Sequence, residues 1–99
     1  MYHEENKVSE ENSIELLDFY ADWCGPCQMM KPVVAEFEKA HPEMRVTPIN
    51  IDDEEELAEK YGVSTIPCFV FLKDGNEVLR EAGVVPLKKL EKMWGKING

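Results

Sequence analysis

Residues 21–27, Ala-Asp-Trp-Cys-Gly-Pro-Cys (ADWCGPC), contain two of the three cysteines of the chain, separated by two residues. Residues 14–21, which lead into this stretch, form a near-continuous apolar run of strand length. From Pro26 onward, apolar residues recur at the three- and four-residue spacing of a helix. The cysteine pair therefore lies where a strand passes into a helix, and it is a metal clip, a structural disulfide or a redox couple.

The helix N-terminus gives the two cysteines different properties. Free backbone N–H groups and the helix dipole stabilise a thiolate at the first position, so we expect Cys24 to be the better nucleophile. Cys27 lies one turn further in, more buried and close enough to form a small disulfide with Cys24. Gly25 allows another backbone to approach, and Pro26 suits the first helical turn, where its missing donor is not needed.

A zinc site requires four ligands, commonly from two pairs at matching spacing. Beyond the pair, the chain offers only Cys68, His3 and His41, and His41 is expected at the far end of the helix. A cluster shared between two chains is a similarly weak alternative. We therefore predict no metal, and the ligand count favours redox chemistry.

Composition narrows the class of protein. The 99 residues, 43% hydrophobic and 31% charged, suit one globular domain, and the net charge of −9 disfavours nucleic acid and anionic membranes as partners. The charge favours partners with basic docking patches. We expect a cytoplasmic protein, because the sequence shows no export signal and no apolar segment that would span a bilayer.

The remaining chain alternates helical and strand patterns. Residues 1–12 are polar and acidic, and we expect them to be disordered or loosely helical. The pattern predicts an α/β fold with the first two strands parallel, joined by a helical crossover, and a later antiparallel hairpin. The expected strands are residues 14–21, 45–51, 68–73 and 77–82, and the expected helices are residues 26–40, a segment ending at Tyr61-Gly62, and residues 87–97.

The acidic run Asp52-Asp53-Glu54-Glu55-Glu56 has two interpretations. An aspartate N-cap followed by acidic first-turn residues would complement the dipole of the second helix. A cation site is the alternative, but contiguous carboxylates on one helical turn do not converge on an ion. We therefore expect a helix start.

These motifs together resemble the thioredoxin family. The resemblance rests on WCGPC within DFYADWCGPC, a following helix with an internal proline, YGVSTIPCFVFLKDG and a later glycine, and it runs from about Ser13 to the C-terminus. It implies a thioredoxin-like domain over residues 13–99, with a mixed sheet of about four strands flanked by about three helices. The family's first strand has no counterpart in residues 1–12.

The resemblance also implies a general protein-disulfide reductase without a bound cofactor. Cys24 would attack a target disulfide, Cys27 would resolve the mixed disulfide, and a thioredoxin reductase using NADPH or ferredoxin would restore the dithiol. The partners would be protein disulfides, and we expect a monomer. The implied buried aspartate is Asp18, the implied cis proline is Pro67, and the implied docking rim comprises Trp23, Gly25, Pro26, Ile66, Pro67, Gly83 and Val84.

The residues themselves support part of this assignment. Asp18 is a carboxylate inside an apolar strand run, where burial should raise its pKa and make it a proton acceptor near neutral pH. The alternative is an aspartate that is merely hydrogen-bonded at the strand end. Trp23 is either core or docking surface.

Two substitutions depart from the family pattern. The lysine that usually faces the buried aspartate is replaced by Pro48, which suits an edge strand because a proline cannot donate to a neighbouring strand. Cys68 follows Pro67 directly, and alternation along the strand should turn its side chain away from the cysteine pair. Cys68 is then either a small buried residue that fills space in the core or a regulatory thiol beside the docking groove.

Other functions remain open from the sequence. An oxidant or isomerase uses the same chemistry, but those relatives usually have histidine at the position of Pro26. A redox-sensing adaptor with the same fold is the non-catalytic alternative. The redox potential of the Cys24/Cys27 couple separates these classes.

Overall fold

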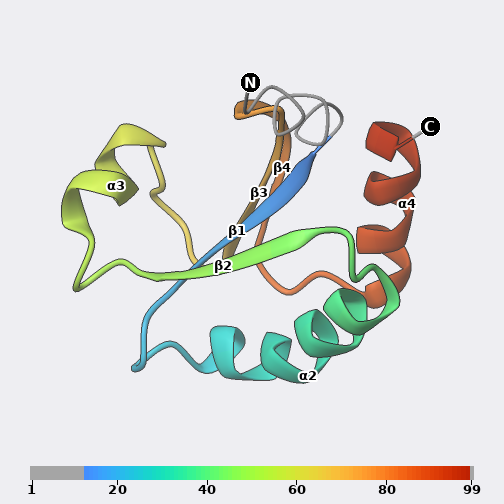
Figure 1. The fold of residues 1–99 in the computed structure, drawn as a ribbon. Helices are drawn as coiled ribbons and strands as arrows, with labels where there is room; N and C mark the ends of the chain where they lie inside the picture. The colour runs from blue at the N-terminus through green and yellow to red at the C-terminus, as the bar shows by residue number, and fades with distance from the viewer. Residues whose placement is uncertain (1–12, 99) are drawn as a thin grey trace.

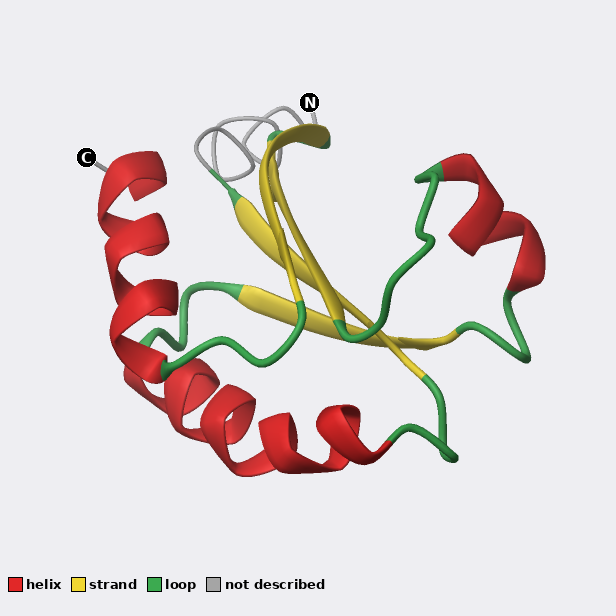
Figure 2. Cartoon of the chain, turned by 180° about the vertical axis from the view of Figure 1, so that it is seen from behind, coloured by secondary structure: helices red, strands yellow, loops and turns green. Residues whose placement is uncertain are grey.

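The computed structural model describes residues 13–98, in which four strands form one sheet with helices on both faces (Figures 1 and 2). The predicted α/β order is confirmed, whereas the predicted polar segment 1–12 lies outside the described residues. In chain order the elements are β1 (Ile14–Tyr20), α2 (Gly25–Ala40), β2 (Arg45–Asn50), α3 (Glu55–Lys60), β3 (Cys68–Lys73), β4 (Asn76–Ala82) and α4 (Leu87–Asn98).

The sheet has the strand order β2-β1-β3-β4. As predicted, β1 and β2 are parallel, while β1–β3 and β3–β4 are antiparallel. The β3–β4 hairpin turns through Asp74 and Gly75, whose φ angles of 54° and 87° match the left-handed backbone of a tight two-residue turn. Asn76 already pairs with Lys73, so the turn is one residue shorter than predicted.

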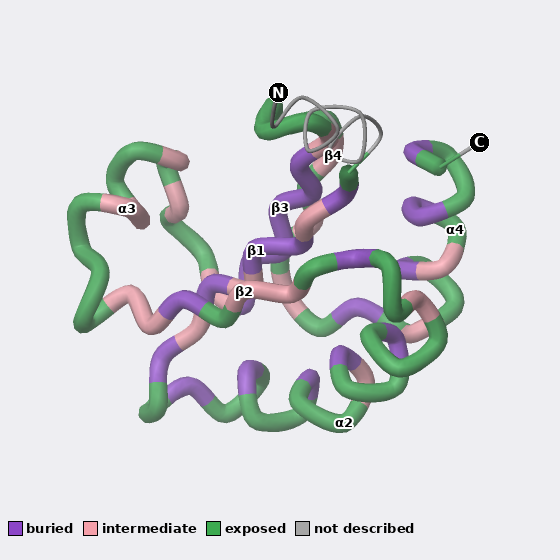
Figure 3. Tube along the Cα trace, viewed as in Figure 1, coloured by how far each residue is buried: buried purple, intermediate pink, exposed green. Residues whose placement is uncertain are grey.

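Helices α2 and α4 lie on one side of the sheet and α3 lies on the other (Figure 1). Successive side chains of β1 point to opposite faces of the sheet, so one strand contacts both helical layers. Leu16 packs on the side of α2 and α4, and Phe19 packs on the side of α3. Strand β3 is buried on both faces, as the purple trace in Figure 3 shows. On α2, the buried residues Met30, Val34 and Phe37 recur at helical spacing.

The start of α3 differs from the expectation. No aspartate caps this helix; it begins at Glu55, and the preceding residues form a turn held by Asn50. The N–H of Glu54 donates to the Asn50 carbonyl at 2.9 Å, and the Asn50 side chain accepts the N–H of Asp52 at 2.9 Å. The acidic first turn and the left-handed Gly62 after the helix, with a φ of 62°, are as predicted.

Two features of the sheet position the site. Strand β1 ends at Tyr20, and its chain turns at once into α2, so the cysteine motif lies at the carboxyl end of a central strand. Within residues 13–98, β2 has a neighbouring strand only on its β1 side. Pro48 lies in this outer strand, directly opposite Asp18 in the register.

Candidate functional site

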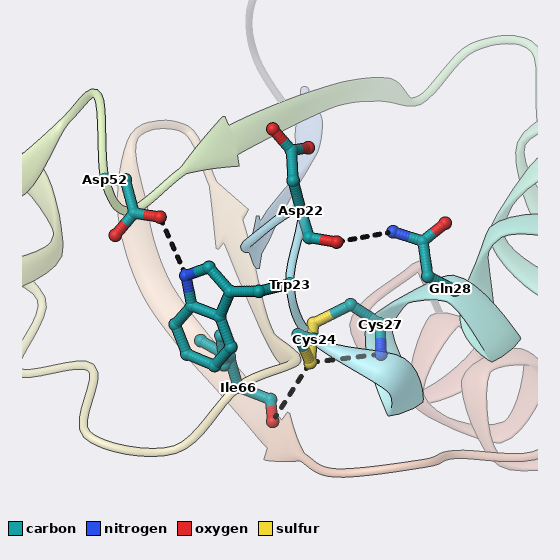
Figure 4. The surroundings of a disulfide bond; sticks show 7 residues. All are labelled: Asp22, Trp23, Cys24, Cys27, Gln28, Asp52 and Ile66. Carbon is teal, nitrogen blue, oxygen red and sulfur yellow. Dashed lines mark hydrogen bonds between the residues drawn. A yellow bond between two sulfur atoms is a disulfide. The ribbon is translucent and has the colours of Figure 1, made fainter.

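Cys24 and Cys27 are joined by a disulfide at the N-terminus of α2 (Figure 4). Their Cα atoms are 5.2 Å apart, and each residue is 5% exposed. Cys24 is the N-cap residue, with the extended backbone typical of that position, and its sulfur accepts the N–H of Cys27 at 3.2 Å. The sulfur of Cys24 therefore occupies the place where a side-chain oxygen usually caps a helix.

This position suits a nucleophilic sulfur. Once the disulfide is reduced, the dipole of the 16-residue helix and the N–H of Cys27 would both stabilise negative charge on Cys24. The sulfur also lies 4.0 Å from the carbonyl oxygen of Ile66 (Figure 4), so the segment before β3 borders the pair. The arrangement can exchange a disulfide with another sulfur that approaches from the loop side.

Asp18 is brought to the same site from β1. It lines a groove of about 420 Å³ between α2 and β2, and Cys27 lines the same groove. Burial raises the pKa of Asp18 to about 6, against the opposing effect of the Lys31 ammonium group. The sequence-based expectation of a raised pKa is therefore met, and the groove connects a carboxylate that titrates near neutral pH with the inner cysteine.

Three chain segments meet around the disulfide. The loop before α2 carries Trp23, which is 69% exposed, and the loop after β4 carries Val84, which is 54% exposed. The N–H of Gly83 donates to the carbonyl oxygen of Pro67 at 2.7 Å, which ties the β4 loop to the segment before β3. The bond between Ile66 and Pro67 is cis, as the resemblance implied.

The expected docking residues differ in exposure. Gly25 and Pro26 are exposed beside Cys24, whereas Ile66 and Gly83 are partly buried. Pro67 is buried, so it shapes the rim from beneath. The large apolar side chains that the rim exposes are therefore those of Trp23 and Val84.

Sequence reasoning missed the partner of Trp23. The indole N–H donates to the Asp52 carboxylate at 2.8 Å, which fixes the ring beside the cysteine loop (Figure 4). The signal was available, because Trp23 follows β1 and Asp52 follows β2. The carboxyl ends of adjacent parallel strands meet at one edge of the sheet, so residues just beyond them can be paired.

Cys68 lies elsewhere. It is 3% exposed and packs with Leu17, Phe19 and Val70 on the α3 side of the sheet, while Cys24 and Cys27 pack with Ala21. Burial raises the pKa of the Cys68 thiol, although the nearby Arg80 acts in the opposite direction. As alternation predicted, the side chain does not join the cysteine pair.

Within residues 13–98, no group of three or more histidine, cysteine, aspartate or glutamate side chains is placed to hold a metal ion. No helix in the same range is long and apolar enough to cross a membrane.

Comparison with known proteins gives a consistent result. The sequence model of the thioredoxin family matches residues 3–96, and so begins upstream of Ser13. The chain is 46% identical to the thioredoxin of Chlamydia caviae and 42% identical to that of Chlamydia pneumoniae, in each case over 92% of this chain and 93% of the relative.

Solved structures agree with the sequence comparison. A thioredoxin from Nicotiana alata superimposes with a TM-score of 0.85 at 34% identity, covering 95% of this chain and 81% of that one. The thioredoxin of Fasciola hepatica superimposes with a TM-score of 0.82 at 36% identity, covering 94% and 88%. Because sequence and fold agree over nearly the whole chain and the cysteine pair is joined at the start of a helix, the chain belongs to the thioredoxin family and is a thiol-disulfide oxidoreductase of the protein-disulfide reductase type.

Proposed function

We propose that the protein reduces a broad range of protein disulfides, with Cys24 as the attacking thiol and Cys27 as the resolving thiol. The Cys24 thiolate attacks one sulfur of a target disulfide, forms a mixed disulfide and releases the other target sulfur as a thiolate, which takes up a proton. The Cys27 thiolate then attacks the sulfur of Cys24, forms the Cys24–Cys27 disulfide and releases the second target thiol. Two electrons pass to the target, and the oxidised pair is the product.

A single observation supports this order of events. The sulfur of Cys24 caps α2 and accepts the N–H of Cys27 at 3.2 Å. The same contact would stabilise a Cys24 thiolate in the reduced protein. Cys27 lies within the first helical turn, so the mixed disulfide would form directly beside it.

Asp18 acts in this proposal as the proton acceptor for Cys27. The two residues line one groove, and the pKa of Asp18 is raised to about 6 by burial, with the Lys31 ammonium opposing the shift. Above that pH the carboxylate is ionised and can accept the proton of the resolving thiol. Asp18→Asn should therefore slow resolution by Cys27 while leaving attack by Cys24 largely intact.

A target would dock on the rim around the disulfide. Trp23 in the loop before α2 and Val84 in the loop after β4 offer exposed apolar surface, and Gly25 and Pro26 are exposed beside Cys24. A net charge of −9 favours targets that carry basic residues beside their disulfide.

The same role implies partners and a location. A thioredoxin reductase drawing on NADPH or ferredoxin would restore the dithiol. A reducing compartment such as the cytoplasm would keep the couple reduced, and a monomer would leave the rim accessible.

Trapping experiments test the roles of the two cysteines. In a disulfide-reduction assay with a model protein substrate, Cys24→Ser should be inactive, because the attacking sulfur is lost. Cys27→Ser should accumulate mixed disulfides through Cys24, and Cys68→Ser is the matched control that should behave as the wild type. Normal turnover by Cys24→Ser would overturn the proposal.

The redox potential of the couple distinguishes the reductase from its alternatives. A value near about −270 mV is typical of thioredoxins, and one near about −180 mV is typical of a disulfide isomerase. A redox-sensing adaptor would instead show no catalytic turnover as wild type, and its binding to a partner would depend on whether the Cys24–Cys27 pair is oxidised or reduced.

A further inference from the structure

The groove beside Asp18 has an unusual wall on the β2 side. Pro48 is the register partner of Asp18 on the adjacent parallel strand, and it lines the groove. Proline carries no charge and no donor, so β2 offers nothing at this position to balance a carboxylate. The other β2 residue of the lining, Val46, is also uncharged, so any positive charge that faces Asp18 in the groove comes from another element.

Helix α2 supplies the cation that lines the groove. Lys31 follows Cys27 by one helical turn and therefore lies on the same face of α2. Both residues line the groove that contains Asp18 and Pro48. The other ionisable groups in its lining are Tyr20, Asp22 and Glu38, so Lys31 is the single basic residue among them.

We propose that Lys31 is a positioning residue of the redox site, which supplies from α2 the positive charge that faces Asp18 across the groove and thereby controls proton exchange between Asp18 and Cys27. The inference rests on the proposed role of Asp18 as proton acceptor. Lys31 touches neither sulfur in this proposal and acts only through the carboxylate.

The electrostatics agree with the geometry. Burial raises the pKa of Asp18 to about 6, and the Lys31 ammonium group is the charge that opposes this rise. Lys31 is exposed, so solvent screens the interaction and its effect should be moderate. Without Lys31 the carboxyl group would stay protonated to a higher pH and would be a poorer proton acceptor at neutral pH.

Titration of Asp18 in the oxidised protein tests the proposal directly. The carboxyl carbon of Asp18 can be followed by NMR against pH while Cys24 and Cys27 are locked in the disulfide and do not titrate. Lys31→Met should raise the pKa of Asp18 by roughly 0.2 to 0.7 unit, the range expected for loss of an exposed charge partner. Lys31→Arg should retain the wild-type value, because it keeps the charge.

Two further variants separate the charge effect from a change of structure. Lys39→Met removes another exposed lysine of α2 that does not line the groove, and it should leave the pKa of Asp18 unchanged. Adding Pro48→Lys to Lys31→Met places an amine on the β2 wall and should lower the pKa of Asp18 again. An unchanged pKa in Lys31→Met, or an equal rise in Lys39→Met, would overturn the proposal.

A kinetic readout separates this inference from the proposed function. In the reduced protein, the pH midpoint for resolution of the mixed disulfide should shift upward with Lys31→Met by the same amount as the pKa of Asp18. A shifted pKa of Asp18 with an unshifted midpoint would show that Asp18 is not the acceptor for Cys27. This result would contradict the proposed role of Asp18 and the control of proton exchange by Lys31, while leaving the charge pair between Lys31 and Asp18 intact.

Discussion

The cysteines of this chain occupy two environments that are almost equally buried and chemically different. Cys24 and Cys27 are each 5% exposed, and Cys68 is 3% exposed. Burial alone therefore does not decide which thiol reacts. The difference lies in what each sulfur contacts, because reactivity depends on how well a thiolate is stabilised.

At the cysteine pair, the contacts are polar and directed. The sulfur of Cys24 accepts a backbone N–H at the start of a helix, and a groove lined by Asp18 borders Cys27. Around Cys68, the packed neighbours are side chains of the sheet core, including Leu17 and Val70. Burial raises the pKa of its thiol, and the nearby Arg80 only opposes this rise. Cysteine is thus a reactive residue at the end of the sheet and a packing residue within it.

The largest expected effect comes from removing the pair and keeping the third cysteine. The Cys24→Ser/Cys27→Ser variant retains Cys68 as its only thiol, and we expect its rate of disulfide reduction to fall at least about 10³-fold, because the attacking nucleophile is absent. The rate is measured with a model protein disulfide under steady reduction. Substantial residual activity that disappears when Cys68 is also replaced would mean that the two environments are not chemically distinct.

Asp18 gives the next largest effect, this time on stability. Its pKa is raised from 3.8 to about 6, so the folded protein binds more protons than the unfolded chain between these values. Stability should therefore fall as pH rises through this window, by at most about 3 kcal/mol from this group. Asp18→Asn cannot ionise and should be more stable than the wild type at pH 7.

Urea unfolding at two pH values checks this expectation. The advantage of Asp18→Asn should be roughly 1 to 3 kcal/mol at pH 7 and should disappear below about pH 4, where the aspartate is protonated in both states. A variant that is less stable than the wild type at pH 7 would indicate that the carboxylate is held by favourable contacts.

Replacing Cys68 should affect packing and leave the chemistry unchanged. Cys68→Ser places a hydroxyl group among apolar side chains, and we expect it to lower the free energy of unfolding by about 1 to 3 kcal/mol. Disulfide reduction at 25 °C should remain within about twofold of the wild type. Mild oxidation should yield only the Cys24–Cys27 bond, so a covalent dimer that forms in the wild type and is lost in Cys68→Ser would assign a regulatory role to this thiol.

Most of the fold could be predicted because local patterns and the global fold agree. Apolar periodicity located β1 and α2, and Gly62 and Gly75 marked positions that adopt a positive φ. The start of α3 was predicted wrongly, because an acidic run resembles a capped helix. In the structure, Asn50 holds a preceding turn instead, and Asp52 binds the Trp23 indole.

Less of the candidate site than of the fold could be predicted from the sequence. The cysteine pair is local, so its spacing and helical context could be read directly, and the raised pKa of Asp18 followed from its apolar surroundings. Lys31 could not be found, because its relation to Asp18 depends on how α2 lies against β1 and β2. The cis bond before Pro67 was predicted from the family resemblance, because most peptide bonds before proline are trans and residue type alone would not have indicated it.

The central claim is that the contacts of each sulfur, and not its degree of burial alone, determine which cysteine reacts. Alkylation of the fully reduced protein with iodoacetamide at pH 7, resolved by mass spectrometry of the three cysteine peptides, tests it most directly. We predict that Cys24 is modified first, Cys27 more slowly, and Cys68 only after denaturant unfolds the chain. In the unfolded chain the three cysteines should be alkylated at similar rates. Modification of native Cys68 at a rate comparable with that of Cys24 would contradict the claim.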